Sequence, residues 1–189
     1  MFETGHFAAL WKKLAEKLGL QAEFIQGDWR SGADPGQIEA YLAEDKAHSI
    51  KAVCVVHNET STGSVSPISE VRKGIDSAGH PALFMVDTIS GLASLEYQHD
   101  AWGVDVTVSG SQKGLMLPPG LSFNAASAKA YLLTSKRMAK QLANHFYTKA
   151  HSSFADSILL RDPNTVVCHP PIVQRDNSVS TITKKKGRR

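Results

Sequence analysis

Apolar positions recur at helical spacing in the first part of the chain and predict amphipathic helices. Between residues 7 and 18, apolar side chains return every three or four positions with lysines and glutamates between them, which is typical of a helix with one buried face. Gly19 follows as a stop signal. A second helix is predicted to start at Asp34 and Pro35, a capping residue followed by a first-turn proline, and a third to start after Pro67.

Nearly continuous apolar runs at residues 50–56, 82–86 and 104–108 predict buried strands. A shorter run at 22–25 is a further strand candidate. Strands that alternate with amphipathic helices are typical of βαβ units. The predicted fold class is therefore α/β, with a mostly parallel sheet and flanking helices, and ligands of such sheets bind beyond the carboxyl ends of the strands.

Each predicted buried strand is followed by a polar segment: HNETSTG at 57–63, DTISG at 87–91 and SGSQK at 109–113. Because parallel strands end at the same edge of a sheet, we expect these segments to converge. Asp87 can pair there with a cationic nitrogen of a ligand, or it can simply cap the next turn. His57 has no partner at metal-binding spacing, so we expect it to be a packing histidine.

Lys113 is the candidate for covalent chemistry. It lies in a loop closed by two prolines and a glycine at 118–120, between small residues and the apolar run 115–117. A desolvated ammonium loses its proton easily, and the free amine can form an imine with a carbonyl compound. The alternative is an ordinary solvated lysine.

Positive charge is concentrated at the C-terminus. The chain of 189 residues has a net charge of +3, and residues 184–189 carry five positive charges. Without them the balance is −2, so no nucleic-acid partner is expected for the body of the chain. The basic tail is expected to be a solvated end, with charge-driven binding as the alternative. The sequence contains no run of 18 apolar residues, so no membrane-spanning helix is predicted.

Four segments together resemble the class V aminotransferases that use pyridoxal 5′-phosphate: residues 2–6, 57–63, 86–90 and 109–120. The serine–glyoxylate type is the nearest match and the alanine–glyoxylate type the next. The resemblance covers residues 1–130 and implies part of the large, cofactor-binding domain of a fold-type I transferase. Residues 131–189 are expected to be a divergent segment, poorly ordered or read in the wrong frame, with a basic tail.

The resemblance also implies a role for each matching residue. Lys113 would carry pyridoxal phosphate and move the proton between substrate and cofactor. Asp87 would pair with the pyridinium nitrogen, Thr60 would hydrogen-bond the ring hydroxyl, and Gln112 would contact the phosphate. Ile89 would pack on the ring.

The implied reaction transfers an amino group from serine, or from alanine, to glyoxylate. Small amino and keto acids would be the substrates, and the family implies a homodimer in the cytoplasm, or in the peroxisome for a eukaryotic chain with the full terminus. A cysteine desulfurase or kynureninase-like relative is the same-fold alternative. A desulfurase needs a reactive cysteine on a mobile loop, and neither Cys54 nor Cys168 has that context.

Several family features are expected to be missing, since members of this family are longer than this chain. They are the glycine-rich phosphate turn, the aromatic residue that stacks on the ring, and the arginine that binds the substrate carboxylate. Neither Trp11 nor Trp29 is expected to replace the aromatic residue. The chain is therefore expected to be a truncated copy with weak or no activity, and the alternatives are a non-catalytic interaction protein and a fragment without function.

Overall fold

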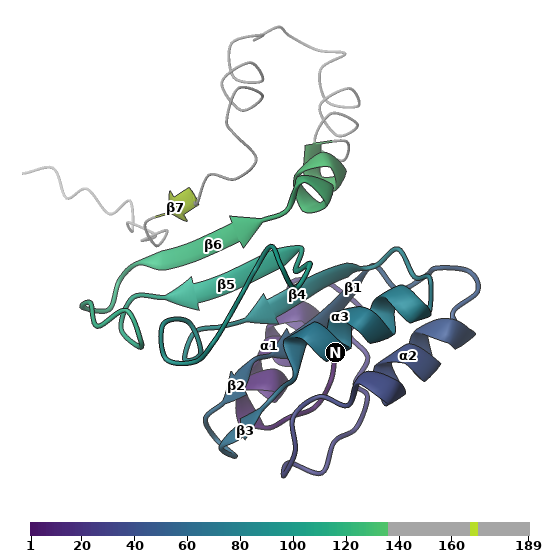
Figure 1. Ribbon diagram of the computed structural model, residues 1–189, viewed down its shortest axis with the longest axis horizontal. Coiled ribbons are helices and arrows are strands. Elements are labelled where there is room, and N and C mark those ends of the chain that lie inside the picture. The colour runs from purple at the N-terminus through teal and green to yellow at the C-terminus, as the bar shows by residue number, and fades with distance from the viewer. Residues whose placement is uncertain (136–166, 170–189) are drawn as a thin grey trace, which may run out of the picture.

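A five-stranded sheet in the order β1-β4-β5-β6-β7 forms the centre of the computed structural model, which describes residues 1–135 and 167–169 (Figure 1). The strands are β1 (Ala52–Val56), β4 (Leu83–Asp87), β5 (Val106–Gly110), β6 (Ser122–Ala126) and β7 (Val167–His169). β1, β4 and β5 are parallel, and β6 and β7 extend the sheet in antiparallel pairs. The predicted α/β fold is confirmed, with its parallel part in the three strands that carry the polar segments.

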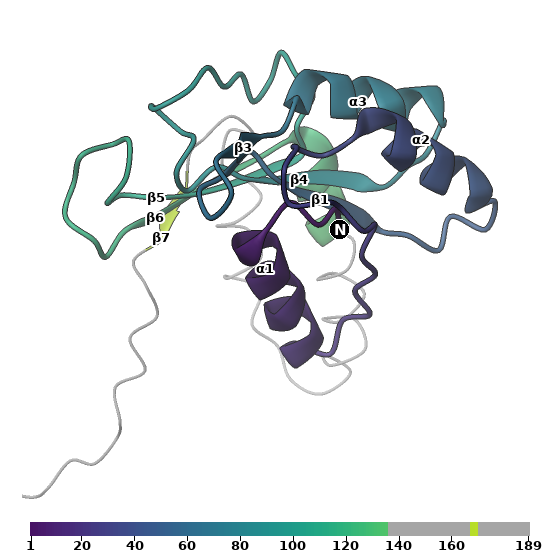
Figure 2. The same ribbon diagram turned by 90° about the horizontal axis from the view of Figure 1, so that it is seen from below.

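Helices cover both faces of this sheet (Figure 2). α2 (Pro35–Glu44) and α3 (Ile68–Ser77) lie together on one face, and α1 (His6–Lys17) lies on the other. The predicted cap of α2 is present, because Asp34 Oδ1 accepts hydrogen bonds from the backbone N–H of Gly36 (2.8 Å) and of Gln37 (3.3 Å). Residues 128–135 are also helical. Among the described helices, none is long and apolar enough to cross a membrane.

The core lies between the sheet and the α2–α3 layer. Val55 of β1 is paired with Val86 of β4, and both side chains are fully buried, as is Phe84. Because successive residues of a strand face opposite sides, the positions between them form the α1 side of the sheet, where Cys54, Met85 and Asp87 are only half-buried. The core cluster also includes helix residues from α2 and α3, namely Ile38, Leu42, Ile68, Val71 and Ile75.

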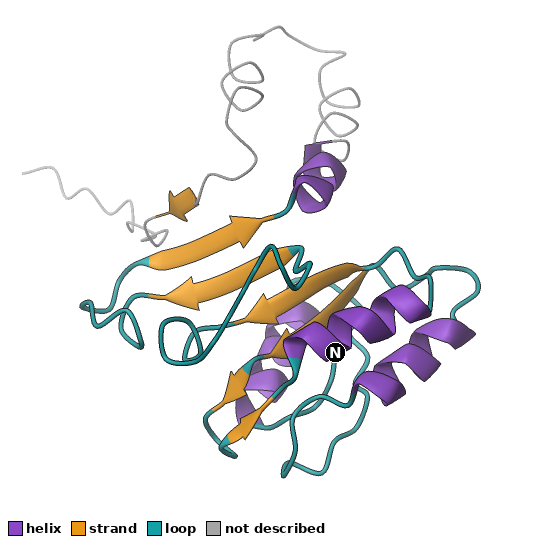
Figure 3. Ribbon diagram, in the orientation of Figure 1, coloured by secondary structure: helices purple, strands orange, loops and turns teal. Residues whose placement is uncertain are grey.

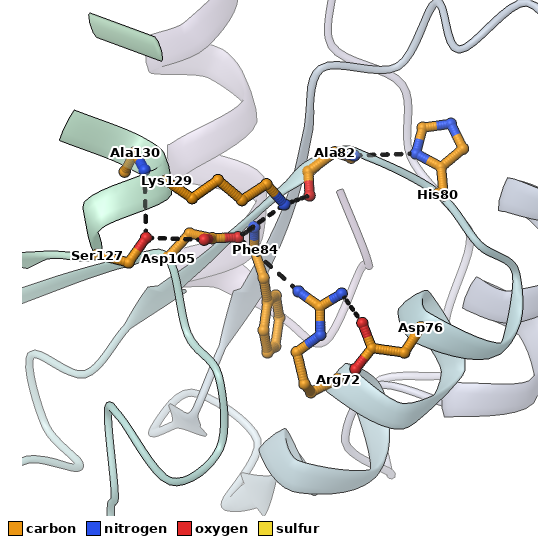
Figure 4. A network of polar contacts seen from close by, with 9 residues as sticks. All are labelled: Arg72, Asp76, His80, Ala82, Phe84, Asp105, Ser127, Lys129 and Ala130. Atoms are coloured by element: carbon orange, nitrogen blue, oxygen red, sulfur yellow. Dashed lines mark hydrogen bonds and ion pairs between the residues drawn. The ribbon is translucent and has the colours of Figure 1, made fainter. Parts of the chain in front are cut away.

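Asp105, directly before β5, holds together the amino edge of the sheet (Figure 4). Its carboxylate accepts hydrogen bonds from the Phe84 backbone N–H (2.9 Å) and the Ser127 hydroxyl (2.8 Å). Lys129 Nζ lies 3.4 Å and Arg72 NH1 3.8 Å from Asp105 Oδ2. One buried carboxylate thus connects α3, β4, β5 and the helix at 128–135. An open hollow of about 540 Å³ lies beside this network, at the edge opposite the polar segments.

Several parts of the structure differ from the sequence prediction or lie beyond it, β7 and the helix at 128–135 among them (Figure 3). The strand candidate at 22–25 forms a single parallel bridge between Ile25 and Phe2. The small hairpin of β2 (Asn58–Glu59) and β3 (Ser64–Val65) was not predicted, because each strand has only two residues. β6 was not predicted because its sequence, SFNAA, has no apolar alternation and its residues are mostly half-buried. The proposed divergent segment 131–189 lies outside the described residues, apart from 131–135 and 167–169.

Candidate functional site

The three polar segments meet at the carboxyl edge of β1, β4 and β5. Asp87, the last residue of β4, is paired with Val108 of β5. The backbone N–H of His57, directly after β1, donates a hydrogen bond to the Asp87 carbonyl oxygen (2.9 Å). Farther along, the Ser90 hydroxyl donates to the Asn58 carbonyl oxygen (2.8 Å). The predicted convergence of these segments at one edge is therefore confirmed.

The loop that carries Lys113 is closed by a buried serine. The Ser111 side chain is fully buried, and its hydroxyl donates to the Pro118 carbonyl oxygen (2.6 Å) and accepts from the Leu121 backbone N–H (3.3 Å). Both ends of the loop are therefore fixed to one side chain at the end of β5. This arrangement holds the short segment with Lys113 in a defined place beyond the sheet.

The same loop packs against the turn that follows Asp87. At Gly114, an added Cβ atom would lie only 2.2 Å from the Leu92 carbonyl oxygen and 2.5 Å from Ser94 Oγ. Only glycine allows the two backbones to approach this closely. Lys113 and Asp87 are thereby placed on neighbouring segments of the same edge.

Lys113, Gln112 and Thr60 are all exposed. In residues 1–135 and 167–169, no hydrogen bond or ion pair engages the Lys113 ammonium. Of the two alternatives for this residue, the structure agrees with an ordinary solvated lysine, because Met116 is 90% and Leu117 46% exposed. The loop projects from the sheet, and these side chains do not cover the amine. Lys113 is accessible, and a ligand that reaches this edge can meet it directly.

Asp87 combines a turn-capping contact with an unpaired charge. Its Oδ1 accepts from the Ile89 backbone N–H (2.8 Å), so it does cap the following turn. Burial raises the pKa of Asp87 above its ordinary value. The hydrogen bond from the Ile89 N–H lowers this pKa in part, and the negative charge of Glu59 raises it further. Within the described part of the chain no cation pairs with this carboxylate. A half-buried carboxylate of this kind suits a ligand that brings a positively charged nitrogen.

His57 is a packing residue, as expected. Its ring is buried, with ring centroids 5.4 Å from Tyr97 and 6.3 Å from Trp102. Burial lowers the pKa of His57, so the neutral form is favoured. Among the described residues its Nδ1 atom has no hydrogen-bond partner, and it lies against the backbone of Gly91. Ile89, assigned by resemblance to ring packing, is 36% exposed at this edge.

Sequence reasoning gave no role to Glu59, which lies in β2, within the polar segment that follows β1. The side chain is fully buried, and its two oxygens accept from the backbone N–H groups of Phe7 (3.3 Å) and Ala8 (3.1 Å) in the first turn of α1. The one available signal was that Gly5, which precedes α1, has no side chain to cap the helix. Phe7 was assigned only to the apolar face of α1, yet its ring is 43% exposed and lies in this first turn.

Comparisons with known proteins assign the chain to a family. The family model "Aminotransferase class-V" matches residues 1–155. Serine–glyoxylate aminotransferase of Methylorubrum extorquens is 52% identical over 126 residues, covering 67% of this chain and 31% of the relative. The enzyme of the same name from Hyphomicrobium methylovorum is 43% identical over 162 residues, covering 86% and 38%.

A solved structure shows the same fold. Alanine–glyoxylate aminotransferase from Nostoc sp. superposes with a TM-score of 0.61 at 31% identity, covering 69% of this chain and 33% of that one. The chain thus spans about a third of the length of the relatives it matches. The match over most of its own length is nevertheless sufficient for assignment, and the chain belongs to the class V aminotransferase family.

Proposed function

We propose that this chain binds pyridoxal 5′-phosphate at the carboxyl edge of β1, β4 and β5, and that it serves amino transfer from serine, or from alanine, to glyoxylate. Membership of the class V family supports the cofactor. The names of the relatives, serine–glyoxylate aminotransferase in two bacteria, support the substrates. Because the chain covers about a third of those relatives, the complete reaction belongs to this proposal.

One observation carries the proposal: an accessible amine lies on one segment of a sheet edge, and a half-buried carboxylate, with no cation beside it in the described part of the chain, lies on the neighbouring segment. Among the residues that the structure describes, Lys113 has no partner that would have to be displaced, and one Asp87 oxygen accepts from no donor. Pyridoxal phosphate offers an aldehyde for an amine and a basic ring nitrogen for a carboxylate. The residues present therefore fit the cofactor.

Each residue contributes a simple physical task. When bound, pyridoxal phosphate supplies an electron-withdrawing ring that stabilises negative charge at the substrate Cα. Asp87 keeps the ring nitrogen protonated through an ion pair in a partly desolvated place. The amine of Lys113 would take the proton from the substrate Cα and deliver it to C4′ of the cofactor, which is the proton shift that amino transfer requires. The Thr60 hydroxyl orients the ring through its oxygen substituent, and the Gln112 amide donates to a phosphate oxygen.

For partners we propose small amino acids and keto acids as substrates, and a second copy of this chain. The support for the second copy is the apolar stripe on α1, where Phe7, Leu10, Leu14 and Leu18 are 43–70% exposed. Such a stripe on a surface helix is costly in water unless another surface covers it. Sedimentation of the purified chain tests this point.

The cofactor proposal is tested by adding pyridoxal phosphate to the purified chain and following the absorbance band of the lysine adduct. We expect saturable binding that is lost in Lys113→Ala and weakened at least about tenfold in Asp87→Asn, since removing a charge pair in a partly buried place costs more than about 1.4 kcal/mol. Lys73→Ala is the matched control, because this lysine is 71% exposed and pairs with Glu70 in α3. Equal binding of pyridoxal phosphate by the three variants would overturn the proposal. The substrates are tested separately, by measuring turnover of serine with glyoxylate.

A further inference from the structure

Glu59 connects two segments that are about fifty residues apart in the sequence. Its oxygens accept from Phe7 N and Ala8 N of α1, and from the backbone N–H (3.3 Å) and hydroxyl (2.5 Å) of Ser61. The Ser61 hydroxyl in turn accepts from the backbone N–H of His6 (2.9 Å). The first turn of α1 is therefore capped by Glu59 and Ser61.

The backbone at Gly5 packs closely against the side chains of Glu59 and Ser61. An added Cβ atom at Gly5 would lie 2.6 Å from Glu59 Cγ and 2.6 Å from Ser61 Oγ. The residue before α1 is therefore glycine, and a side chain supplied from the 57–63 segment takes the capping role. A further hydrogen bond joins the same two parts of the chain, because Thr62 Oγ1 donates to the Thr4 carbonyl oxygen (3.3 Å).

Thr60 lies between the two anchored residues. Glu59 and Ser61 are both tied to α1, whereas the Thr60 side chain is exposed and has no hydrogen-bond partner among the described residues. A residue whose two neighbours are fixed has little backbone freedom, even when its own side chain makes no contact. The backbone position of Thr60 is therefore restricted by the contacts of Glu59 and Ser61.

We propose that Glu59 is a positioning residue, which fixes the 57–63 segment to the first turn of α1 and thereby holds the Thr60 hydroxyl in place beside Asp87 for the cofactor. The inference rests on the proposed function for its purpose, and on the contacts of Glu59 for its mechanism. The backbone bond from His57 to Asp87 and the bond from Ser90 to Asn58 place the same segment next to the Asp87 turn.

The chemistry of the contacts requires a carboxylate. All four groups around the two oxygens are used as donors: three backbone N–H groups and one hydroxyl. A carboxylate accepts at both oxygens, whereas an amide would turn an NH₂ group toward one of these donors. Glu59→Gln keeps the shape and volume of the side chain and removes one acceptor and the charge. It therefore disturbs the anchor without opening a cavity.

The first arm of the test uses the chain without cofactor. Hydrogen exchange of the Phe7 and Ala8 amides and nitrogen-15 relaxation of Thr60 are measured in the original chain and in Glu59→Gln. We expect the two amides to exchange about tenfold faster, because each loses a hydrogen bond to a charged acceptor, and Thr60 to become more mobile. Glu70→Gln is the matched control and leaves all three signals unchanged. Ser61→Ala gives a smaller change in the same direction and replaces Glu59→Gln if that variant does not fold.

The second arm measures the affinity for pyridoxal phosphate in Glu59→Gln, Thr60→Val and the double variant. If Glu59 acts through Thr60, each single change weakens binding about tenfold, and the double change weakens it little more than one of them. A purely structural Glu59 would give multiplied effects, about a hundredfold, and overturn its role toward the cofactor. Unchanged Thr60 mobility in the first arm would overturn the positioning itself. Altered mobility in a chain that never binds the cofactor would instead overturn the proposed function and leave the positioning standing.

Discussion

Replacing Asp105 by asparagine is expected to destabilise the whole sheet, although the residue lies far from the candidate site. The Asp105 side chain is 6% exposed and joins four elements through two hydrogen bonds and two ion pairs. Asparagine has almost the same shape but carries no charge, and it accepts at only one of its two terminal atoms. The change therefore isolates the electrostatic part of the network.

The size of the effect follows from the individual contacts. Asparagine can keep the Phe84 N–H bond and turn its NH₂ group to Ser127, whose hydroxyl can reverse, so the weaker hydrogen bonding costs about 1 kcal/mol. Lys129 is 40% exposed, so losing its partner costs about 0.5 kcal/mol. Arg72 is 14% exposed but also pairs with Asp76, so its loss is about 1 kcal/mol. The expected total is about 2–3 kcal/mol.

Urea unfolding followed by tryptophan fluorescence measures this loss. Asp100→Asn is the matched control, because its side chain is 93% exposed and it should change the free energy of unfolding by less than about 0.5 kcal/mol. A value for Asp105→Asn that equals the control would refute the account of the network. The comparison requires that the unfolding free energy depends on urea concentration with the same slope in both variants as in the original chain.

Two further predictions concern the candidate site. Asp87→Asn should stabilise the cofactor-free chain at neutral pH, because burial raises the pKa of this carboxyl in the folded state and the ionised form therefore costs free energy. By linkage, the stability of the original chain should decline as pH rises from the ordinary aspartate pKa of 3.8 through the raised value, and unfolding curves of the variant should lack this decline. Gly114→Ala should lower stability by about 1–3 kcal/mol, because its Cβ would meet the Leu92 carbonyl oxygen at 2.2 Å. Thermal unfolding tests this, with Gly36→Ala, in the first turn of α2, as a tolerated control.

The regular elements of this fold could be predicted because each one repeats a simple pattern. The apolar spacing gave α1, α2, α3 and the three parallel strands, though not the helix at 128–135, and the rule for α/β sheets placed the polar segments at one edge. Lys113 and Asp87 were candidates from the residues themselves, Thr60 and Gln112 came from the family resemblance, and the roles of all four remain proposals.

What sequence reasoning could not supply was contact between distant segments. Glu59 caps a helix that begins about fifty residues earlier, and no local pattern connects the two. β6 has no apolar alternation because it is half-buried along its length. The sequence left open whether Lys113 is desolvated or solvated, because apolar residues that follow it in sequence need not fold over it, and here they do not. Neighbours along the chain need not be neighbours in space.

The most direct measurement of the central claim is to locate the lysine that pyridoxal phosphate modifies. The purified chain is incubated with the cofactor, reduced with borohydride to fix the bond, digested and analysed by mass spectrometry. The account predicts a phosphopyridoxyl group on Lys113 at low cofactor concentration, greatly reduced when Asp87 is replaced by asparagine. Modification spread evenly over the exposed lysines, with no preference for Lys113, would contradict it.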